Sequence, residues 1–168
     1  KQRLALAAAV LHKPRILLLD EPTAGVDPQA RRDFWDQIHA LAREGMTVLV
    51  STHYMDEAER CHEIAYIAYG ELLAHGTAGE VVKQSNLTTY SVTGEGLVQL
   101  AAALEKQPGV DSVAPFGTSL HVSGRDSAAL EAAISSHRND AKLSWKPIDA
   151  SLEDVFIGLM AQAKDNVS

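Results

Sequence analysis

Two acidic residues follow a run of bulky aliphatic residues near the start of the chain. Asp20 and Glu21 come directly after ILLL at residues 16–19, although Asp and Glu are poor strand formers and cost free energy when buried unpaired. Ligands of open α/β sheets bind at the carboxyl ends of the strands. There, an Asp can hold a hydrated Mg²⁺ and a neighbouring Glu can polarise an attacking water. A plainer interpretation is that the acids cap the next turn, and the Asp-Glu pair alone favours it.

A nearby histidine and a turn that contains another acid favour the interpretation as a site for magnesium and water. The apolar segment VLVST at 48–52 runs into His53, and TAGVDP at 23–28 follows the acidic pair closely. If both apolar segments are strands of one sheet, His53 and the acids point into the same crevice. A lone histidine is more often structural, but the three features together, in this order, form one specific pattern.

The elements around these residues predict an α/β layer. A helix is expected at 1–11, strands at 15–19 and 46–52, a helix at 27–45, a short helix at 54–61 and a hairpin at 63–76. Asp27 is a good N-cap for the second helix, and Pro28 suits its first position. Two apolar strands joined by a helix predict a βαβ unit whose parallel strands are buried on both faces. The polar segment 77–86 closes this region.

The second half of the chain has a different order of elements. Strands are expected at 88–94, 111–117, 119–124 and 142–149, with helices at 97–107, 127–137 and 151–163. This βαββαβ order is that of a small ferredoxin-like α+β domain. Ser151 and Asp154 form a capping-box-like start to the last helix. We therefore expect two domains, at residues 1–84 and 85–168.

Composition narrows the class of protein. The 168 residues carry a net charge of −7 and one cysteine, so a nucleic acid is not expected as a partner and a disulfide framework is excluded within the chain. The apolar stretch at 4–11 is too short to span a bilayer. The chain begins with Lys1 inside a helix-like segment, and we expect it to be a piece of a longer protein.

These motifs resemble the ATP-binding cassette (ABC) ATPase family. ILLLDEP at 16–22 is similar to the Walker B motif with its catalytic Glu, AGVDP at 24–28 to the D-loop and STH at 51–53 to the H-loop; KQRLALAAAVLHKP at 1–14 resembles the helix after the signature motif. The second half resembles the C-terminal domain of ABC-2-type export ATPases through PGV at 108–110 and SLEDVFI at 151–157.

The resemblance implies a role for each matching residue. Asp20 would hold Mg²⁺ through water, Glu21 would be the general base, Asp27 would communicate across a dimer, and His53 would contact the γ-phosphate. It also implies the C-terminal part of a P-loop (RecA-like) ABC ATPase sheet with flanking helices. ATP would lie between this domain and a second ATP-binding domain. Closure would drive a transmembrane permease from the cytoplasmic face of the cell membrane.

The sequence also departs from the family. No G-x-x-x-x-G-K-[ST] loop occurs in these residues, and this loop cradles the phosphates of ATP. We therefore expect the chain alone to be inactive and its parent to be an exporter ATPase. The alternatives are a soluble ABC-type ATPase acting in DNA repair or on the ribosome, and a non-catalytic regulatory or dimerisation fragment. The second domain is expected to stabilise or dimerise the protein, with a small-molecule sensor as its alternative.

Other conspicuous residues receive structural interpretations. Phe34 and Trp35 are expected in the core, and Arg31 and Arg32 at the surface. The acidic residues after His53, within 53–59, are expected on a solvated helix face.

Overall fold

The chain forms two compact units in a computed structural model that describes residues 2–163. The N-terminal unit comprises Lys1–Glu57 and the C-terminal unit Ala58–Ser168. Lys1 of the first expected helix lies outside the described residues. In the described part of the chain, no helix is both long and apolar enough to cross a bilayer.

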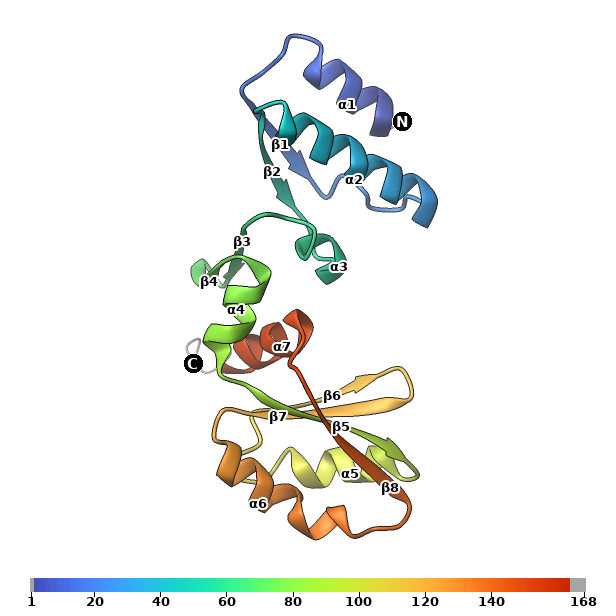
Figure 1. Ribbon diagram of the computed structural model, residues 1–168, viewed down its shortest axis with the longest axis vertical. Helices are drawn as coiled ribbons and strands as arrows, with labels where there is room; N and C mark the ends of the chain where they lie inside the picture. The colour runs from blue at the N-terminus through green and yellow to red at the C-terminus, as the bar shows by residue number, and fades with distance from the viewer. Residues whose placement is uncertain (1, 164–168) are drawn as a thin grey trace. The chain divides into compact units, whose positions relative to one another are not determined.

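The N-terminal unit contains the βαβ motif. In chain order its elements are α1 (Gln2–Val10), β1 (Ile16–Asp20), α2 (Pro28–Arg43), β2 (Thr47–Ser51) and all but the last residue of α3 (Met55–Ala58). Strands β1 and β2 pair in parallel, with Ile16 opposite Thr47 and Asp20 opposite Ser51 (Figure 1). The predicted parallel pairing is thus confirmed, and it brings the two strand ends level with each other.

Burial in this unit differs from the expectation for the strands. Phe34, Trp35 and Ile38 of α2 are buried as expected. On β1, however, Leu17 is buried while Leu18 is 70% exposed. Burial alternates because successive side chains of a strand point to opposite faces and only one face is covered. The prediction that both faces are buried is therefore wrong for this structure.

The C-terminal unit combines a hairpin, a four-stranded sheet and four helices. Its elements are β3 (Ile64–Ala68), β4 (Glu71–Gly76), α4 (Ala78–Ser85), β5 (Thr88–Gly94), α5 (Leu97–Leu104), β6 (Ser112–Phe116), β7 (Ser119–Gly124), α6 (Ser127–Arg138), β8 (Leu143–Ile148) and α7 (Leu152–Ala163). The larger sheet has the order β6-β7-β5-β8, and every pair in it is antiparallel.

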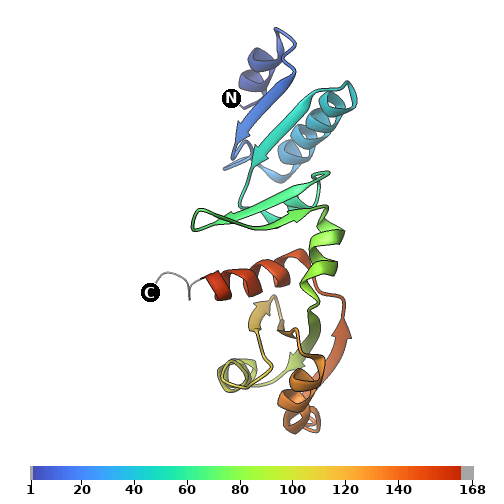
Figure 2. The ribbon, with the colours of Figure 1, turned by 90° about the vertical axis from the view of Figure 1, so that its left-hand side faces the viewer.

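Helices cover both faces of this sheet. Helices α5 and α6 lie against one face, and α7 lies at the other, next to the β3–β4 hairpin (Figures 1 and 2). The core between the sheet and α5 and α6 is aliphatic apart from one tyrosine, and consists of Tyr90, Val92, Leu100, Leu104, Leu120, Val122, Leu130 and Ile134. The first turn of α7 is closed by the expected capping box, in which Ser151 Oγ accepts from the Asp154 N–H at 3.1 Å.

One helix was absent from the sequence-based expectations. The polar segment 77–86 contains the helix α4 (Ala78–Ser85), and Thr77 and Glu80 build a full capping box at its start. This T-x-x-E spacing is itself a helix signal, so the segment was recognisable.

The two compact units do not divide the chain where the family domains were expected to meet. The hairpin packs within the C-terminal unit, since the Tyr66 ring stacks on the Phe156 ring at 4.2 Å between centroids. The assignment of 1–84 to a nucleotide-binding domain and 85–168 to an accessory domain stays a prediction, because it concerns ancestry and function rather than compactness.

Candidate active site

The parallel register brings the polar residues at the two strand ends together. Asp20 and Ser51 are opposite each other in the ladder, and Ser51 Oγ donates a hydrogen bond to Asp20 Oδ1. The Glu21 N–H donates to the carbonyl of Ser51 at 3.0 Å and approaches Ser51 Oγ at 3.3 Å. Ser51, which sequence analysis included only as part of the STH segment, therefore holds both acidic residues.

The structure places Glu21 and His53 in direct contact. His53 Nδ1 lies 3.2 Å from Glu21 Oε1, and the two side chains are 58% and 52% exposed, respectively. A solvent-accessible carboxylate beside an imidazole can accept a proton from water and pass that proton to a neighbouring group. Glu21 also has a φ of 40°, which is uncommon for a residue other than glycine and occurs preferentially at functional sites.

Tight turns connect the acidic pair to α2. The Ala24 N–H donates to the Glu21 carbonyl at 3.2 Å, and the Val26 N–H donates to the Thr23 carbonyl at 3.1 Å. Gly25 has a φ of 68°, a conformation that glycine adopts without steric cost. The turn therefore starts at the candidate base and delivers the chain to the helix within seven residues, at Pro28.

Asp27 caps α2, as predicted. Its Oδ1 accepts from the N–H groups of Gln29 and Ala30, at 3.1 and 2.9 Å. Asp20, Glu21 and His53 are thus brought together at the strand ends, whereas the Asp27 carboxylate is held at the helix N-terminus.

A second polar layer was missed by sequence analysis. Glu57 has no exposed side-chain surface and accepts hydrogen bonds from the hydroxyls of Thr23 and Thr52. Arg31, expected at the surface, is only 25% exposed and has its Nε 3.5 Å from Glu57 Oε1. The interpretation of 53–59 as a solvated face is therefore wrong for Glu57. Nothing in the sequence separates this Glu from its exposed neighbour Asp56, because tertiary contacts alone decide which acid is buried.

The strand-end oxygens fit one mode of magnesium binding. Within residues 2–163, no group of three or more His, Cys, Asp or Glu side chains is arranged to hold a metal ion. Mg²⁺ at phosphate sites is usually held by one or two carboxylates, waters and the substrate's own phosphates. The exposed Asp20 carboxylate beside the Ser51 hydroxyl offers oxygen ligands of this kind.

A protein-family model matches the part of the chain that carries this site. Residues 1–55 match the model described as "AAA domain, putative AbiEii toxin, Type IV TA system".

Curated relatives cover more of the chain. It is 53% identical over 85 residues to the "Probable multidrug ABC transporter ATP-binding protein YbhF" of Escherichia coli, covering 51% of this chain and 15% of that protein. It is also 34% identical over 165 residues to the "Nod factor export ATP-binding protein I" of Burkholderia pseudomallei, covering 95% of this chain and 51% of that protein. The chain thus spans about half the length of the second relative and less of the first.

A solved structure shows a partial likeness. CbiO1 from Clostridium perfringens, described as part of the ABC transporter complex cbiONQ, is 27% identical with a TM-score of 0.42, over 50% of this chain and 37% of that one. A score at this level does not establish a shared fold.

Proposed function

We propose that this chain, whose homologues are ABC transporter ATP-binding proteins over most of its length, is part of the ATP-hydrolysing subunit of an ABC exporter. The observation that carries the proposal is the contact between Glu21 and His53 at the ends of two parallel strands. The names of both relatives, one a multidrug transporter protein and one an export protein, support the exporter class. They do not favour a soluble ATPase of DNA repair or the ribosome.

Glu21 is the proposed general base. Its carboxylate is solvent-accessible and stands at a strand end, where a water could approach both it and a bound phosphate. His53, at 3.2 Å, can orient this carboxylate and contact the terminal phosphate of ATP with its other ring nitrogen. The hydrogen bonds from the Glu21 backbone to Ser51 support the role, because they fix the base against the neighbouring strand.

Asp20 is the proposed magnesium-side residue. Its carboxylate accepts from Ser51 Oγ, which orients it at the end of β1, and it would hold Mg²⁺ through water. Magnesium, when bound, would neutralise negative charge on the phosphates of ATP.

Asp27 is the proposed point of communication with a second ATP-binding domain. Its carboxylate and the following helix fix the end of the turn that begins at Glu21. A movement of this turn in a dimer would therefore be transmitted to the base. The turn thus offers a route from a second ATP-binding domain, which the family resemblance implies, to the base.

The accessory domain is proposed to be ferredoxin-like and to stabilise or dimerise the protein. The strand order β6-β7-β5-β8 with helices between β5 and β6 and between β7 and β8 supports this class. We further propose that β1 and β2 belong to a P-loop sheet. The proposed partner is a transmembrane permease, and the proposed location is the cytoplasmic face of the membrane.

Co-purification from membranes tests the exporter proposal. The complete gene product that carries this chain would be tagged, extracted in detergent and analysed by mass spectrometry. A polytopic membrane protein should be recovered with it, and equally with a Glu21→Gln variant, which changes the base but no surface that a permease would need. Recovery of ribosomal proteins or nucleic acid in its place would contradict the proposal.

A further inference from the structure

A buried carboxylate joins the two segments that carry Glu21 and His53. Glu57 on α3 has 0% exposure, its Oε1 accepts from the Thr23 hydroxyl, and its Oε2 accepts from Thr52 Oγ1 at 2.8 Å. A buried carboxylate without hydrogen-bond donors would strongly destabilise the folded state. The two hydroxyls therefore help to compensate the burial of this carboxylate.

The two threonines come from the two segments that carry the site. Thr23 belongs to the turn that begins at Glu21, and Thr52 directly precedes His53. Thr52 Oγ1 also accepts from the Tyr54 N–H at 3.1 Å. The bonds of Thr52 thus hold the backbone on both sides of His53, and Glu57 joins that loop to the turn of Glu21.

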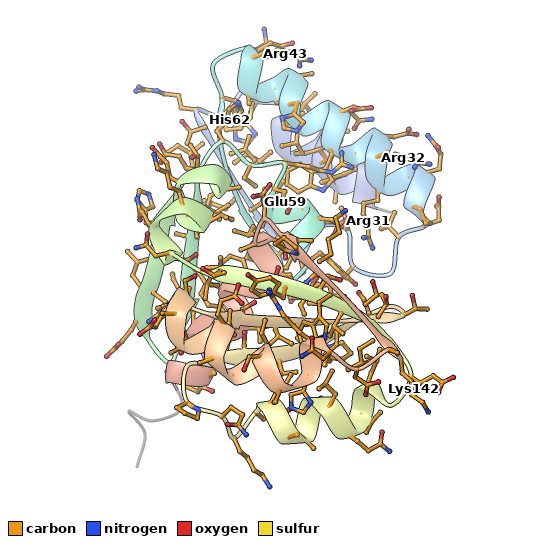
Figure 3. All side chains as sticks on the ribbon, turned by 60° about the horizontal axis from the view of Figure 1, so that its bottom comes forward. Arg31, Arg32, Arg43, Glu59, His62 and Lys142 are labelled. Carbon is orange, nitrogen blue, oxygen red and sulfur yellow. The ribbon has the colours of Figure 1, made fainter. Side chains whose placement is uncertain are left out.

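Arg31 closes the cluster from α2. Its Nε lies 3.5 Å from Glu57 Oε1 and its Nη1 lies 3.8 Å from Asp56 Oδ2. Its guanidinium carbon is 4.5 Å from the centroid of the Tyr54 ring. Figure 3 shows Arg31 next to α3 and its neighbour Arg32 farther from it. Positive charge on Arg31 offsets the negative charge of the buried carboxylate. The contact also connects α2 to the cluster of Glu57, Thr23 and Thr52.

We propose that Glu57 is a positioning residue, which sets the separation of Glu21 and His53 by tying Thr23 to Thr52. The inference rests on the proposed function, in which Glu21 and His53 act on ATP. Glu57 itself touches neither of the two side chains through any hydrogen bond described above. Its effect on rate would come from geometry, and a misplacement of about 1 Å can reduce a rate by about 100-fold.

Two substitutions of Glu57 separate geometry from charge. Glu57→Leu removes both acceptors. Glu57→Gln keeps the shape, and its amide can accept from one threonine hydroxyl and donate to the other. Asp36→Leu is the matched control, because Asp36 is an exposed acid on α2 outside the cluster.

Steady-state kinetics of the complete gene product give the first measurement. Glu57→Leu should lower kcat for ATP hydrolysis by about 10- to 100-fold with KM changed by less than about twofold, and Glu57→Gln should stay within about threefold of the parent. In a His53→Ala background, Glu57→Leu should lower kcat by less than about twofold, because one of the two groups whose separation Glu57 sets is already absent.

The nucleotide-free 168-residue chain gives a second measurement that does not depend on activity. In ¹H–¹⁵N spectra, Glu57→Leu should move the amide signals of Glu21 and His53, while Glu57→Gln and Asp36→Leu leave them near their parent positions. If Glu57→Leu does not fold, Thr52→Val carries the test, with Thr52→Ser as the variant that keeps the hydroxyl.

The outcomes distinguish this inference from the proposed function. An unchanged kcat in both Glu57→Leu and Thr52→Val would overturn the inference alone. The inference alone would also be overturned if Glu57→Leu lowered kcat by the same factor in the His53→Ala background as in the parent. Failure of Glu57→Gln to restore kcat would also overturn it. If the complete gene product shows no ATP hydrolysis that is lost on substitution of Glu21, the proposed function is overturned. This inference is then overturned with it.

Discussion

His53 Nδ1 lies 3.2 Å from Glu21 Oε1, although the two residues are 32 positions apart in the sequence. The contact exists because β1 and β2 run parallel and end at the same level, with Asp20 opposite Ser51. The parallel register of β1 and β2 therefore brings the two residues together. The proposed ATPase function depends on this contact.

The cap of α2 should be separable from the proposed role of Asp27 in a dimer. Asp27→Ala should lower the free energy of unfolding by about 1 kcal/mol, because the N–H groups of Gln29 and Ala30 lose their acceptor. Asp27→Ser should retain most of that stability, since serine also caps helices. Urea unfolding monitored by circular dichroism would measure both.

The same two variants test communication between domains. In the complete gene product, Asp27→Ser should reduce ATP hydrolysis while leaving the protein folded. Full hydrolysis by Asp27→Ser would contradict the dimer role and leave Asp27 as a helix cap only.

Trp35 should dominate the stability of the N-terminal unit. It is 2% exposed, so Trp35→Ala should cost about 3–5 kcal/mol by creating a large cavity. Its Nε1 is buried and has no hydrogen-bond partner among the described residues, so Trp35→Phe should cost much less, because no hydrogen bond is lost. Amide signals of α2 and β2 followed during urea titration would report this unit.

A control residue is available in the other unit. Val98 is 80% exposed, and Val98→Ala should change stability by less than about 0.5 kcal/mol. Equal costs for Trp35→Ala and Trp35→Phe would contradict the cavity as the source of the lost stability.

The overall order of elements was predictable because it depends on local patterns. Apolar runs, glycine and proline positions and capping residues indicated β1, α2, β2 and the βαββαβ order that follows. The strand-end site followed from the same patterns, since parallel strands place their carboxyl ends at one edge.

The buried polar layer was not predictable, because it depends on which side chains meet after folding. Asp56 and Glu57 are adjacent acids on one short helix, yet only Glu57 is buried between Thr23 and Thr52. Arg31 and Arg32 are similarly adjacent. Arg31 reaches Glu57, whereas Arg32 donates to Gln29 on its own helix. Local sequence assigns the same environment to both members of each pair.

The capping box of α4 should make stability depend on pH. The pKa of Glu80 is lowered from its ordinary value of 4.5, first by the Thr77 backbone N–H and then by the Thr77 hydroxyl. Because the folded pKa is below the unfolded one, the stabilisation is complete above that ordinary value and is lost as pH falls through the lower folded pKa.

Thermal unfolding from about pH 7 to about pH 3 would measure this effect. Glu80→Gln should unfold at a lower temperature than the parent at neutral pH, and the difference should shrink in acid. Thr77→Ser, which keeps the hydroxyl, should follow the parent. A difference that stays constant across the range would contradict the carboxylate's role.

The 168-residue chain alone should not hydrolyse MgATP. It contains Asp20, Glu21 and His53 but no G-x-x-x-x-G-K-[ST] loop, and such loops supply the N–H groups and the lysine that hold the phosphates. Phosphate release by the purified chain should equal that of a Glu21→Gln control. Turnover that is lost on this substitution would contradict the expectation.

The most direct test of the account is ATP hydrolysis by the complete gene product with and without Glu21→Gln. We predict a loss of about 100-fold or more in kcat, because a general base contributes about that much, while ATP binding and folding are retained. Asp36→Asn, an exposed acid on α2, should hydrolyse ATP at the parent rate. A Glu21→Gln protein that keeps its rate within about twofold would contradict the assignment of Glu21 as the base, and with it the proposed site.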